Sequence, residues 1–347
     1  MSFSVAITPS NRTFTMQRDE TVLSAAINAG IGLPYGCKDG ACGSCKCKLI
    51  EGRVIHGAHQ EKALSLKEEE AGYMLTCCAT PQTDLVLECK QVVGVGDHPV
   101  VKMPTRLTSL TRLAPDVMVL RLQLPVTNNF GFRAGQYIEF VLKDGQRRSY
   151  SMANAPHAVK EAGPEGIELH IRHMPGGVFT DQVFSTMKEK DILRVEGPFG
   201  TFFLRDESER PVVLLGSGTG FAPLKAIIED MRHKGLTRPT VLYWGCRSKA
   251  DLYMHDWAAQ QAAELPWLTY VPVLSEAGPQ DNWTGRTGFV HQAVLADLPD
   301  LSAHEVYACG APIMVQSARA DFIAKAGLPE EYFYADAFTS AADKASS

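Results

Sequence analysis

Cysteine is concentrated in one short stretch of the chain. Residues 36–48 hold four of the nine cysteines, and three of them follow the spacing C-x4-C-x2-C: Cys37, Cys42 and Cys45. Three thiolates at this spacing, completed by a remote fourth cysteine, are typical of a [2Fe-2S] site. Cys77 and Cys78 supply candidates for the fourth ligand. We expect a glycine-rich loop here, because three thiolates that converge from one segment leave no room for a helix or strand.

The same thiols have two alternative uses. One is a disulfide pair, and the other is structural zinc held by Cys42 and Cys45 together with Cys77 and Cys78. Zinc sites usually draw their ligands from two C-x2-C pairs. Here the downstream pair is adjacent and Cys37 would be unused. The spacing therefore favours the cluster.

Composition limits the remaining possibilities. A chain of 347 residues with 45% hydrophobic residues predicts two or three folded domains. It contains no run of eighteen apolar residues and no signal-like start, so we expect no membrane span and a cytoplasmic location, which also suits nine cysteines. The net charge of −5 makes a nucleic-acid partner unlikely. Residues 98–205 are nevertheless basic, with 14 Lys and Arg against 10 Asp and Glu, as a segment that holds a pyrophosphate would be.

The first third of the chain has recognisable elements around the cysteine loop. Two strand-like runs flank Ser10-Asn11-Arg12, a helix is expected over 21–29, and Ser65-x-x-Glu68 predicts the start of a short helix. With a final strand over 84–88, this order resembles plant-type ferredoxins across residues 1–93. In that family the first cysteine of a Leu-Thr-Cys segment is the ligand, which implies Cys77 and leaves Cys47 and Cys78 unbound.

The middle third contains short β runs after an irregular stretch, 94–104, that we interpret as a linker. The runs predict a small antiparallel barrel. Within it, Arg-x-Tyr-Ser, a preceding Phe-Arg-Ala-Gly-Gln-Tyr and a later Pro-Gly-Gly-Val-Phe-Thr resemble the flavin domain of ferredoxin reductases. The resemblance implies that the flavin is bound by Arg148, Ser149, Tyr150, Ser151, Gly176, Gly177, Val178, Phe179 and Thr180.

Physical chemistry supports several of these roles. Arg148 can offer a bidentate fork to a phosphate. Tyr150 has a flat face for the edge of the isoalloxazine, and Ser151 has a hydroxyl for the region of its reactive nitrogen. A helix that begins near Thr180 would favour the diphosphate at its N-terminus.

The last third alternates strand and helix, which predicts a parallel sheet with helices on both faces. It opens with a strand followed by Gly-x-Gly-Thr-Gly-x-Ala-Pro, which departs from the G-x-G-x-x-G fingerprint because Phe221 replaces the third glycine. This form resembles the pyridine-nucleotide domain of ferredoxin reductases. The resemblance implies nucleotide contacts from Gly218, Thr219, Gly220, Gly310 and Pro312, and it implies that Cys309 lies at the nicotinamide.

Three further residues complete the assignments. Arg247, after a predicted strand, could bind the 2′-phosphate of NADPH or could lie in a solvated turn; we favour NADH. Residues 333–338 resemble the segment that covers the flavin in this family, which implies Asp336 as an acidic partner and Phe338 as a ring over the isoalloxazine. An aromatic strand near a C-terminus is also common in ordinary cores.

Residues 1–338 together resemble the fused reductases of the CDP-6-deoxy-3,4-glucoseen reductase type and the reductase components of oxygenases. We therefore expect a multidomain α+β and α/β protein: a plant-type ferredoxin domain (1–94), an antiparallel β-barrel flavin domain (103–206) and a parallel-sheet nucleotide-binding domain (207–347). NADH releases electrons as a hydride pair and a cluster takes them singly, so FAD is expected between them. The partner would be an oxygenase or dehydratase component. The alternative function is a redox sensor with incidental turnover.

Overall fold

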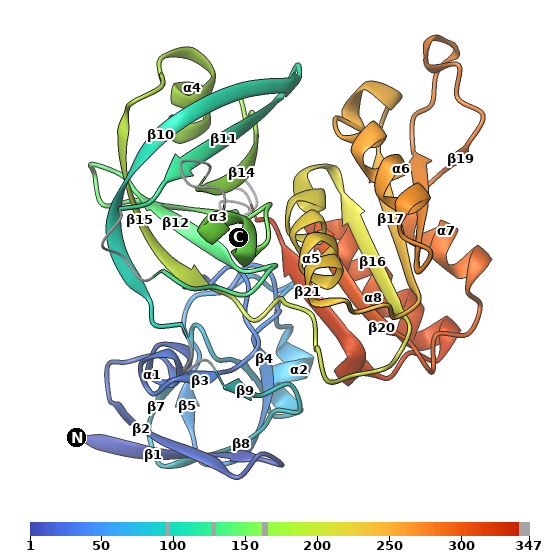
Figure 1. Cartoon of the computed structure of the whole chain (residues 1–347). Coiled ribbons are helices and arrows are strands. Elements are labelled where there is room, and N and C mark those ends of the chain that lie inside the picture. Colours follow the sequence, from blue (N-terminus) through green and yellow to red (C-terminus); the bar gives the residue numbers. More distant parts are fainter. Residues whose placement is uncertain (95–97, 126–129, 162–165, 340–347) are drawn as a thin grey trace. The chain divides into compact units, whose positions relative to one another are not determined.

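The computed structural model describes residues 1–94, 98–125, 130–161 and 166–339 (Figure 1). The chain divides into two compact units. The first comprises Met1–His98 and two short later segments, and the second comprises Pro99–Phe199 with Phe203–Tyr334. In the described part of the chain, no helix combines the length and the apolar character needed to cross a bilayer.

A mixed five-stranded sheet in the order β2-β1-β8-β4-β6 forms the first unit. Its strands are β1 (Ser2–Thr8), β2 (Arg12–Gln17), β4 (Lys46–Glu51), β6 (Tyr73–Leu75) and β8 (Leu85–Glu88). Two small pairs are added, β3 (Ile31–Gly32) with β9 (Val93–Gly94) and β5 (Val54–Ile55) with β7 (Thr80–Pro81). The buried faces of β1 and β8 contribute Val5, Ile7, Leu85 and Leu87 to the core.

Both helices predicted in this unit are present, and each begins at a side-chain cap. Helix α1 (Val22–Asn28) starts after Thr21, whose side chain accepts a hydrogen bond from the Ser24 N–H. Helix α2 (Leu66–Glu70) starts at a reciprocal capping box between Ser65 and Glu68. These caps satisfy N–H groups that have no intrahelical partner.

The second unit contains an antiparallel, barrel-like sheet in the order β13-β12-β15-β10-β11-β14. Its elements are β10 (Val101–Ala114), β11 (Val117–Gln123), β12 (Tyr137–Val141), β13 (Arg147–Ser151), α3 (Pro156–Glu161), β14 (Ile167–Arg172), α4 (Val178–Ser185) and β15 (Ile192–Phe199). An isolated bridge between Met152 and Leu169 joins the two ends of the sheet order. Leu107, Ile138 and Phe140 belong to its buried core.

The predicted linker over 94–104 is wrong at its end. Strand β10 already begins at Val101 and pairs with β15 through Pro104 opposite Arg194. Proline donates no ladder hydrogen bond, and together with the absence of periodicity it argued against a strand. The pairing with β15, about ninety residues further along the sequence, nevertheless holds residues 101–104 in an extended strand. Residues 95–97 of this stretch lie outside the described residues.

A further sheet has the order β19-β18-β17-β16-β20-β21, and its pairs from β19 to β20 are parallel. The elements are β16 (Val212–Ser217), α5 (Phe221–Lys234), β17 (Thr240–Cys246), α6 (His255–Glu264), β18 (Leu268–Leu274), β19 (Arg286–Thr287), α7 (Val290–Asp297), β20 (Glu305–Gly310), α8 (Pro312–Ala326) and β21 (Phe333–Ala337). Gly235 ends α5 in the left-handed conformation, which glycine adopts without strain.

Candidate functional site

The cysteine loop connects β3 to β4 and has no helix or strand, as expected. Its cysteines, together with Cys77, associate in two pairs. The N–H of Cys37 lies 3.5 Å (N to Sγ) from Cys42. The Sγ atoms of Cys45 and Cys77 are 3.2 Å apart. The structure therefore brings the turn after β6 to the loop, and the fourth predicted cysteine lies against the third.

This paired arrangement suits two irons better than one ion. A single tetrahedral Zn²⁺ needs four ligands that converge on one point. Among the described residues, no three His, Cys, Asp or Glu side chains do so. In a [2Fe-2S] cluster the four thiolates divide between two irons, so two separate pairs are what the group requires. An amide N–H directed at a cysteine sulfur also matches the polar environment known from such sites.

The neighbouring thiols differ in position. Cys78 lies 3.5 Å (Sγ to Sγ) from Cys77 and is half-buried. Cys47, on β4, is hydrogen-bonded to Cys89 instead, and both are buried. This hydrogen bond, together with burial, raises the pKa of Cys47 well above its usual range. Cys47 therefore already has a partner, Cys89, outside the proposed set of ligands.

Strand β13 presents the residues predicted to bind flavin. Arg148 donates hydrogen bonds to the Arg147 carbonyl (2.8 Å) and to Oε1 of Gln146 (2.6 Å). Among the described residues it contacts no carboxylate, so its charge is available for a phosphate. Arg147, by contrast, is paired with Glu139 (2.8 Å) and Glu196 (2.7 Å).

The aromatic part of this surface is preorganised. The Tyr150 ring lies 5.5 Å from Phe179 and 5.8 Å from Phe140, measured between centroids. Burial raises the pKa of Tyr150 well above its usual range, so the phenol stays neutral. Ser151 is buried at the end of the strand, and Ser149 is exposed. The ring of Tyr150 is therefore held by packing before any cofactor binds.

The predicted pyrophosphate turn precedes α4, which begins at Val178 rather than near Thr180. The Gly176 N–H donates to Oδ2 of Asp181 (3.1 Å), and the Gly177 N–H donates to the Met174 carbonyl (2.8 Å). The first amides of a helix have no intrahelical acceptor. We therefore assign the anion-binding role mainly to the helix start at Val178 and Phe179, with Gly176 and Gly177 shaping the turn.

The glycine turn after β16 is a 3-10 segment, Gly218–Gly220, that leads into α5. No side chain would fit at Gly220, the last residue of this segment, or at Gly310, the last residue of β20. A Cβ on Gly220 would lie 2.2 Å from the Cys309 carbonyl oxygen, and one on Gly310 (φ +127°) would lie 2.3 Å from Oγ of Ser217. The ends of β16 and β20 therefore meet at backbone distance, as a cradle for a dinucleotide requires.

Phe221 explains the departure from the usual fingerprint. Its ring is buried and stacks on Trp244 at 4.0 Å between centroids, with an interplanar angle of 14°. The Trp244 indole N–H in turn donates to the Gly218 carbonyl (2.9 Å). The aromatic pair thus supports the turn at a position where a third glycine would leave a gap.

Comparison with known proteins agrees with this geometry. Three family models match: a 2Fe-2S iron-sulfur cluster binding domain (residues 5–82), an oxidoreductase FAD-binding domain (104–204) and an oxidoreductase NAD-binding domain (214–320). The CDP-6-deoxy-L-threo-D-glycero-4-hexulose-3-dehydrase reductase of Yersinia pestis is 42% identical over 97% of this chain and 99% of its own length. The chain belongs to the fused iron-sulfur flavoprotein reductases.

Other members of this reductase family act with different partners. Terephthalate 1,2-dioxygenase reductase component 1 of Comamonas sp. is 34% identical over 97% of this chain and 98% of its own. The crystal structure of a cytochrome P450 reductase from Amycolatopsis superposes with a TM-score of 0.77 at 32% identity, over 97% and 99% of the two chains. The predicted fold class, the [2Fe-2S], FAD and NAD(H) cofactors and the oxidoreductase class are thereby confirmed.

The remaining predicted residues of the reductase lie as follows. Cys309, on β20 opposite Gly216 of β16, is completely buried. Pro312 opens α8. Asp336 is buried, and a Cβ on Gly36 of the cysteine loop would lie 3.6 Å from its Oδ1. Phe338 follows β21 and is half-buried, whereas the side chain of Arg247 is 62% exposed and 4.0 Å (Nε to Oδ2) from Asp251.

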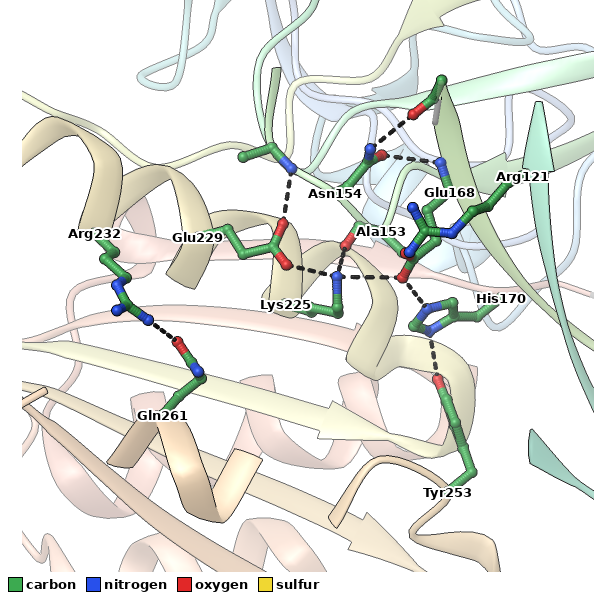
Figure 2. Close-up of polar contacts among 12 residues, drawn as sticks. Arg121, Ala153, Asn154, Glu168, His170, Lys225, Glu229, Arg232, Tyr253 and Gln261 are labelled. Atoms are coloured by element: carbon green, nitrogen blue, oxygen red, sulfur yellow. Dashed lines mark hydrogen bonds and ion pairs between the residues drawn. The ribbon is translucent and has the colours of Figure 1, made fainter. Parts of the chain in front are cut away.

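One group of polar residues in the reductase was missed from the sequence. Glu168 and His170 on β14 and Lys225 on α5 are buried and in polar contact (Figure 2). Glu168 and Lys225 also line a cavity of about 530 Å³. The signal was present, since each is a charged or titratable residue inside an apolar run such as Ile167–Ile171. A buried charge requires a partner, but the sequence does not show which one.

Gly220→Ala tests the close approach at the nucleotide turn. The added methyl would meet the Cys309 carbonyl, which cannot rotate away. We expect overpacking to lower the free energy of unfolding by about 1–3 kcal/mol and to slow flavin reduction by NADH. Urea unfolding followed by circular dichroism measures the first effect. Thr219→Ala, which adds no bulk, is the control and should stay within about 0.5 kcal/mol. Equal stability of Gly220→Ala and wild type would contradict the close approach of Gly220 to the Cys309 carbonyl.

Proposed function

We propose that this reductase takes electrons from NADH and delivers them singly to a separate protein, a CDP-sugar dehydratase component or an oxygenase component. The observation that carries the proposal is the two-pair arrangement of Cys37, Cys42, Cys45 and Cys77 in a chain that also has flavin and nucleotide domains. The dehydratase is our first choice, because the 42% identical relative is named for one.

Each predicted residue receives a role within the proposal. The four cysteines hold the cluster. Arg148 and the start of α4 neutralise the flavin diphosphate, Tyr150 and Ser149 border the ring system, and Ser151 donates a hydrogen bond near its reactive nitrogen. When bound, FAD would accept electrons as a pair and release them one at a time.

The nucleotide is positioned by the cradle between β16 and β20. Its contacts are proposed from the following residues: Gly218, Thr219, Gly220, Cys309, Gly310 and Pro312. Cys309 limits the space at the nicotinamide because it is buried and its backbone touches the glycine turn. We propose Asp336 as an acidic partner at the flavin and Phe338 as the ring over the isoalloxazine. Cys47 and Cys78 do not bind the cluster in this proposal.

We propose NADH as the donor. Oγ of Ser248 donates to Oδ2 of Asp251 (3.0 Å), and the Arg247 guanidinium lies beside the same carboxylate. An Asp251 carboxylate among these groups would repel the 2′-phosphate of NADPH by like charge. We also propose a cytoplasmic location, because a reducing compartment preserves cysteines of this number and spacing.

Sustained oxidation of NADH distinguishes a reductase from a redox sensor. The purified holoprotein is expected to oxidise NADH steadily when cytochrome c is present as a one-electron acceptor, at a rate proportional to enzyme. The same assay with NADPH should give a lower kcat/KM. A redox sensor would instead show one equivalent of reduction without sustained consumption, and that result would overturn the proposal. Addition of candidate dehydratase or oxygenase components then tests the acceptor.

A further inference from the structure

Two buried side chains of opposite charge connect the barrel to the nucleotide helix inside the second unit. Lys225 of α5 lies 3.2 Å (Nζ to Oε1) from Glu168 of β14, and each side chain is only 5% exposed. Lys225 also forms an ion pair of 2.6 Å with Glu229 one turn along the same helix. Arg121 of β11 donates to the second oxygen of Glu168 (2.8 Å). Figure 2 shows these side chains converging.

The same helix holds the backbone that follows the flavin strand. Nζ of Lys225 donates to the Ala153 carbonyl (3.0 Å), and Oε2 of Glu229 accepts from the Ala155 N–H (3.1 Å). Ala153 is two residues beyond Ser151, the last residue of β13. Lys225 is five residues beyond Gly220, the last residue of the nucleotide turn. The Lys225–Glu229 pair on α5 therefore connects the backbone after the flavin strand β13 with the helix that follows the nucleotide turn.

A second connection runs through His170. Its Nε2 lies 2.9 Å from Oε1 of Glu168, and its Nδ1 lies 2.8 Å from the Tyr253 hydroxyl oxygen. An ionised carboxylate only accepts, so Nε2 carries the proton in the contact with Glu168. The Tyr253 ring packs edge-on against Trp244 at 5.3 Å between centroids. Trp244 holds the Gly218 carbonyl, so contacts continue without a break from the barrel to the glycine turn.

The charges in this group are balanced. Burial alone would raise the pKa of Glu168, but the hydrogen bond from His170 and the charges of Lys225 and Arg121 lower it to about 2. Burial lowers the pKa of His170, which keeps that ring neutral. Two carboxylates, Glu168 and Glu229, thus face two cations. Glu168 and Lys225 are the buried members, each 5% exposed, and they favour one geometry because any shift would leave a buried charge uncompensated.

We propose that Lys225 and Glu229 form a clamp that fixes the flavin strand relative to the nucleotide turn and thereby sets the geometry for hydride transfer. They are positioning residues, since they touch only the protein segments that bind the cofactors. The inference rests on the proposed function, in which Ser151 contacts the flavin and the glycine turn holds NADH. Hydride transfer is sensitive to such positioning, because a displacement of about 1 Å can slow a reaction about 100-fold.

The test is anaerobic stopped-flow reduction of the flavin by NADH in Lys225→Met. We expect the variant to keep FAD and the visible cluster spectrum, to bind NADH with little change, and to reduce its flavin about 10- to 100-fold more slowly. With NADH deuterated at C4, the slowed step should show a primary isotope effect at least as large as in wild type. Lys234→Met is the matched control: that lysine, on the same helix, also forms an ion pair with a carboxylate four positions away, Asp230, but is 41% exposed.

A second pair of variants does not rely on the stability of Lys225→Met. Glu229→Gln keeps an oxygen that can accept from the Ala155 N–H, whereas Glu229→Leu does not. We expect flavin reduction near the wild-type rate in the first and at least about fivefold slower in the second. Reduction at the wild-type rate in both Lys225→Met and Glu229→Leu would overturn the clamp, as would a slow reduction without an isotope effect. A wild-type protein whose flavin NADH does not reduce would instead overturn the proposed function.

Discussion

Cys45→Ser is expected to abolish the visible absorption of the [2Fe-2S] cluster while FAD and the nucleotide site persist. Cys45 is buried and its sulfur lies against that of Cys77, so its replacement removes one proposed ligand and disturbs the position of another. Ferricyanide reduction by NADH should continue, because this small acceptor takes electrons from reduced flavin directly. Transfer to cytochrome c should fall by at least about tenfold, because we place the cluster at the electron exit.

Two neighbouring cysteines supply the controls. Cys47→Ser and Cys78→Ser should leave the visible spectrum nearly intact, since Cys47 faces Cys89 and Cys78 is not a proposed ligand. Equal loss of ferricyanide and cytochrome c reduction in Cys45→Ser would indicate a folding defect or a cluster elsewhere in the path. Retention of both activities would show that the loop is not the exit.

Arg148→Ala should yield protein that retains iron but has lost most of its FAD. The side chain is free of carboxylate partners among the described residues, so its charge is available to the flavin phosphate. Removal of one partner from a charged hydrogen-bonded pair costs about 2–5 kcal/mol of binding free energy. Flavin released by heat, measured by fluorescence against iron content, gives the occupancy.

The adjacent arginine is the matched control. Arg147 is paired with Glu139 and Glu196, and we assign it no contact with flavin. Arg147→Ala should therefore keep FAD, although it should lose stability, because Glu139 is only 3% exposed and would lose a charged partner. Full flavin content in Arg148→Ala, or equal depletion in both variants, would refute the assignment of Arg148.

Local spacing made much of this protein predictable. The cysteine loop, the caps of α1 and α2 and the glycine turn before α5 each depend on residues within about a dozen positions of one another, and the structure has all of them. A motif of this kind constrains the backbone directly, through a turn, a cap or a converging set of ligands.

Pairings between distant segments were not predictable in the same way. Strand β10 begins at Val101 because β15 lies beside it, and Lys225 is buried because Glu168 lies opposite. Phe221 replaced a glycine, and its partner Trp244 is on the next strand of the sheet. Each of these sequence features is unusual: a proline lies in a strand, a lysine lies in an apolar run, and a phenylalanine lies where a glycine is expected. A contact with a distant segment explains each of them.

The contact between Cys47 and Cys89 has a consequence for maturation. The first 94 residues contain seven cysteines, and an unfolded chain would offer all of them to incoming iron. Once β4 and β8 pair, Cys47 and Cys89 are enclosed in the sheet and hydrogen-bonded to each other, while the loop thiols remain at its edge. Sheet formation before cluster insertion would therefore withdraw these two thiols from competition for iron, and the order of assembly becomes a source of selectivity.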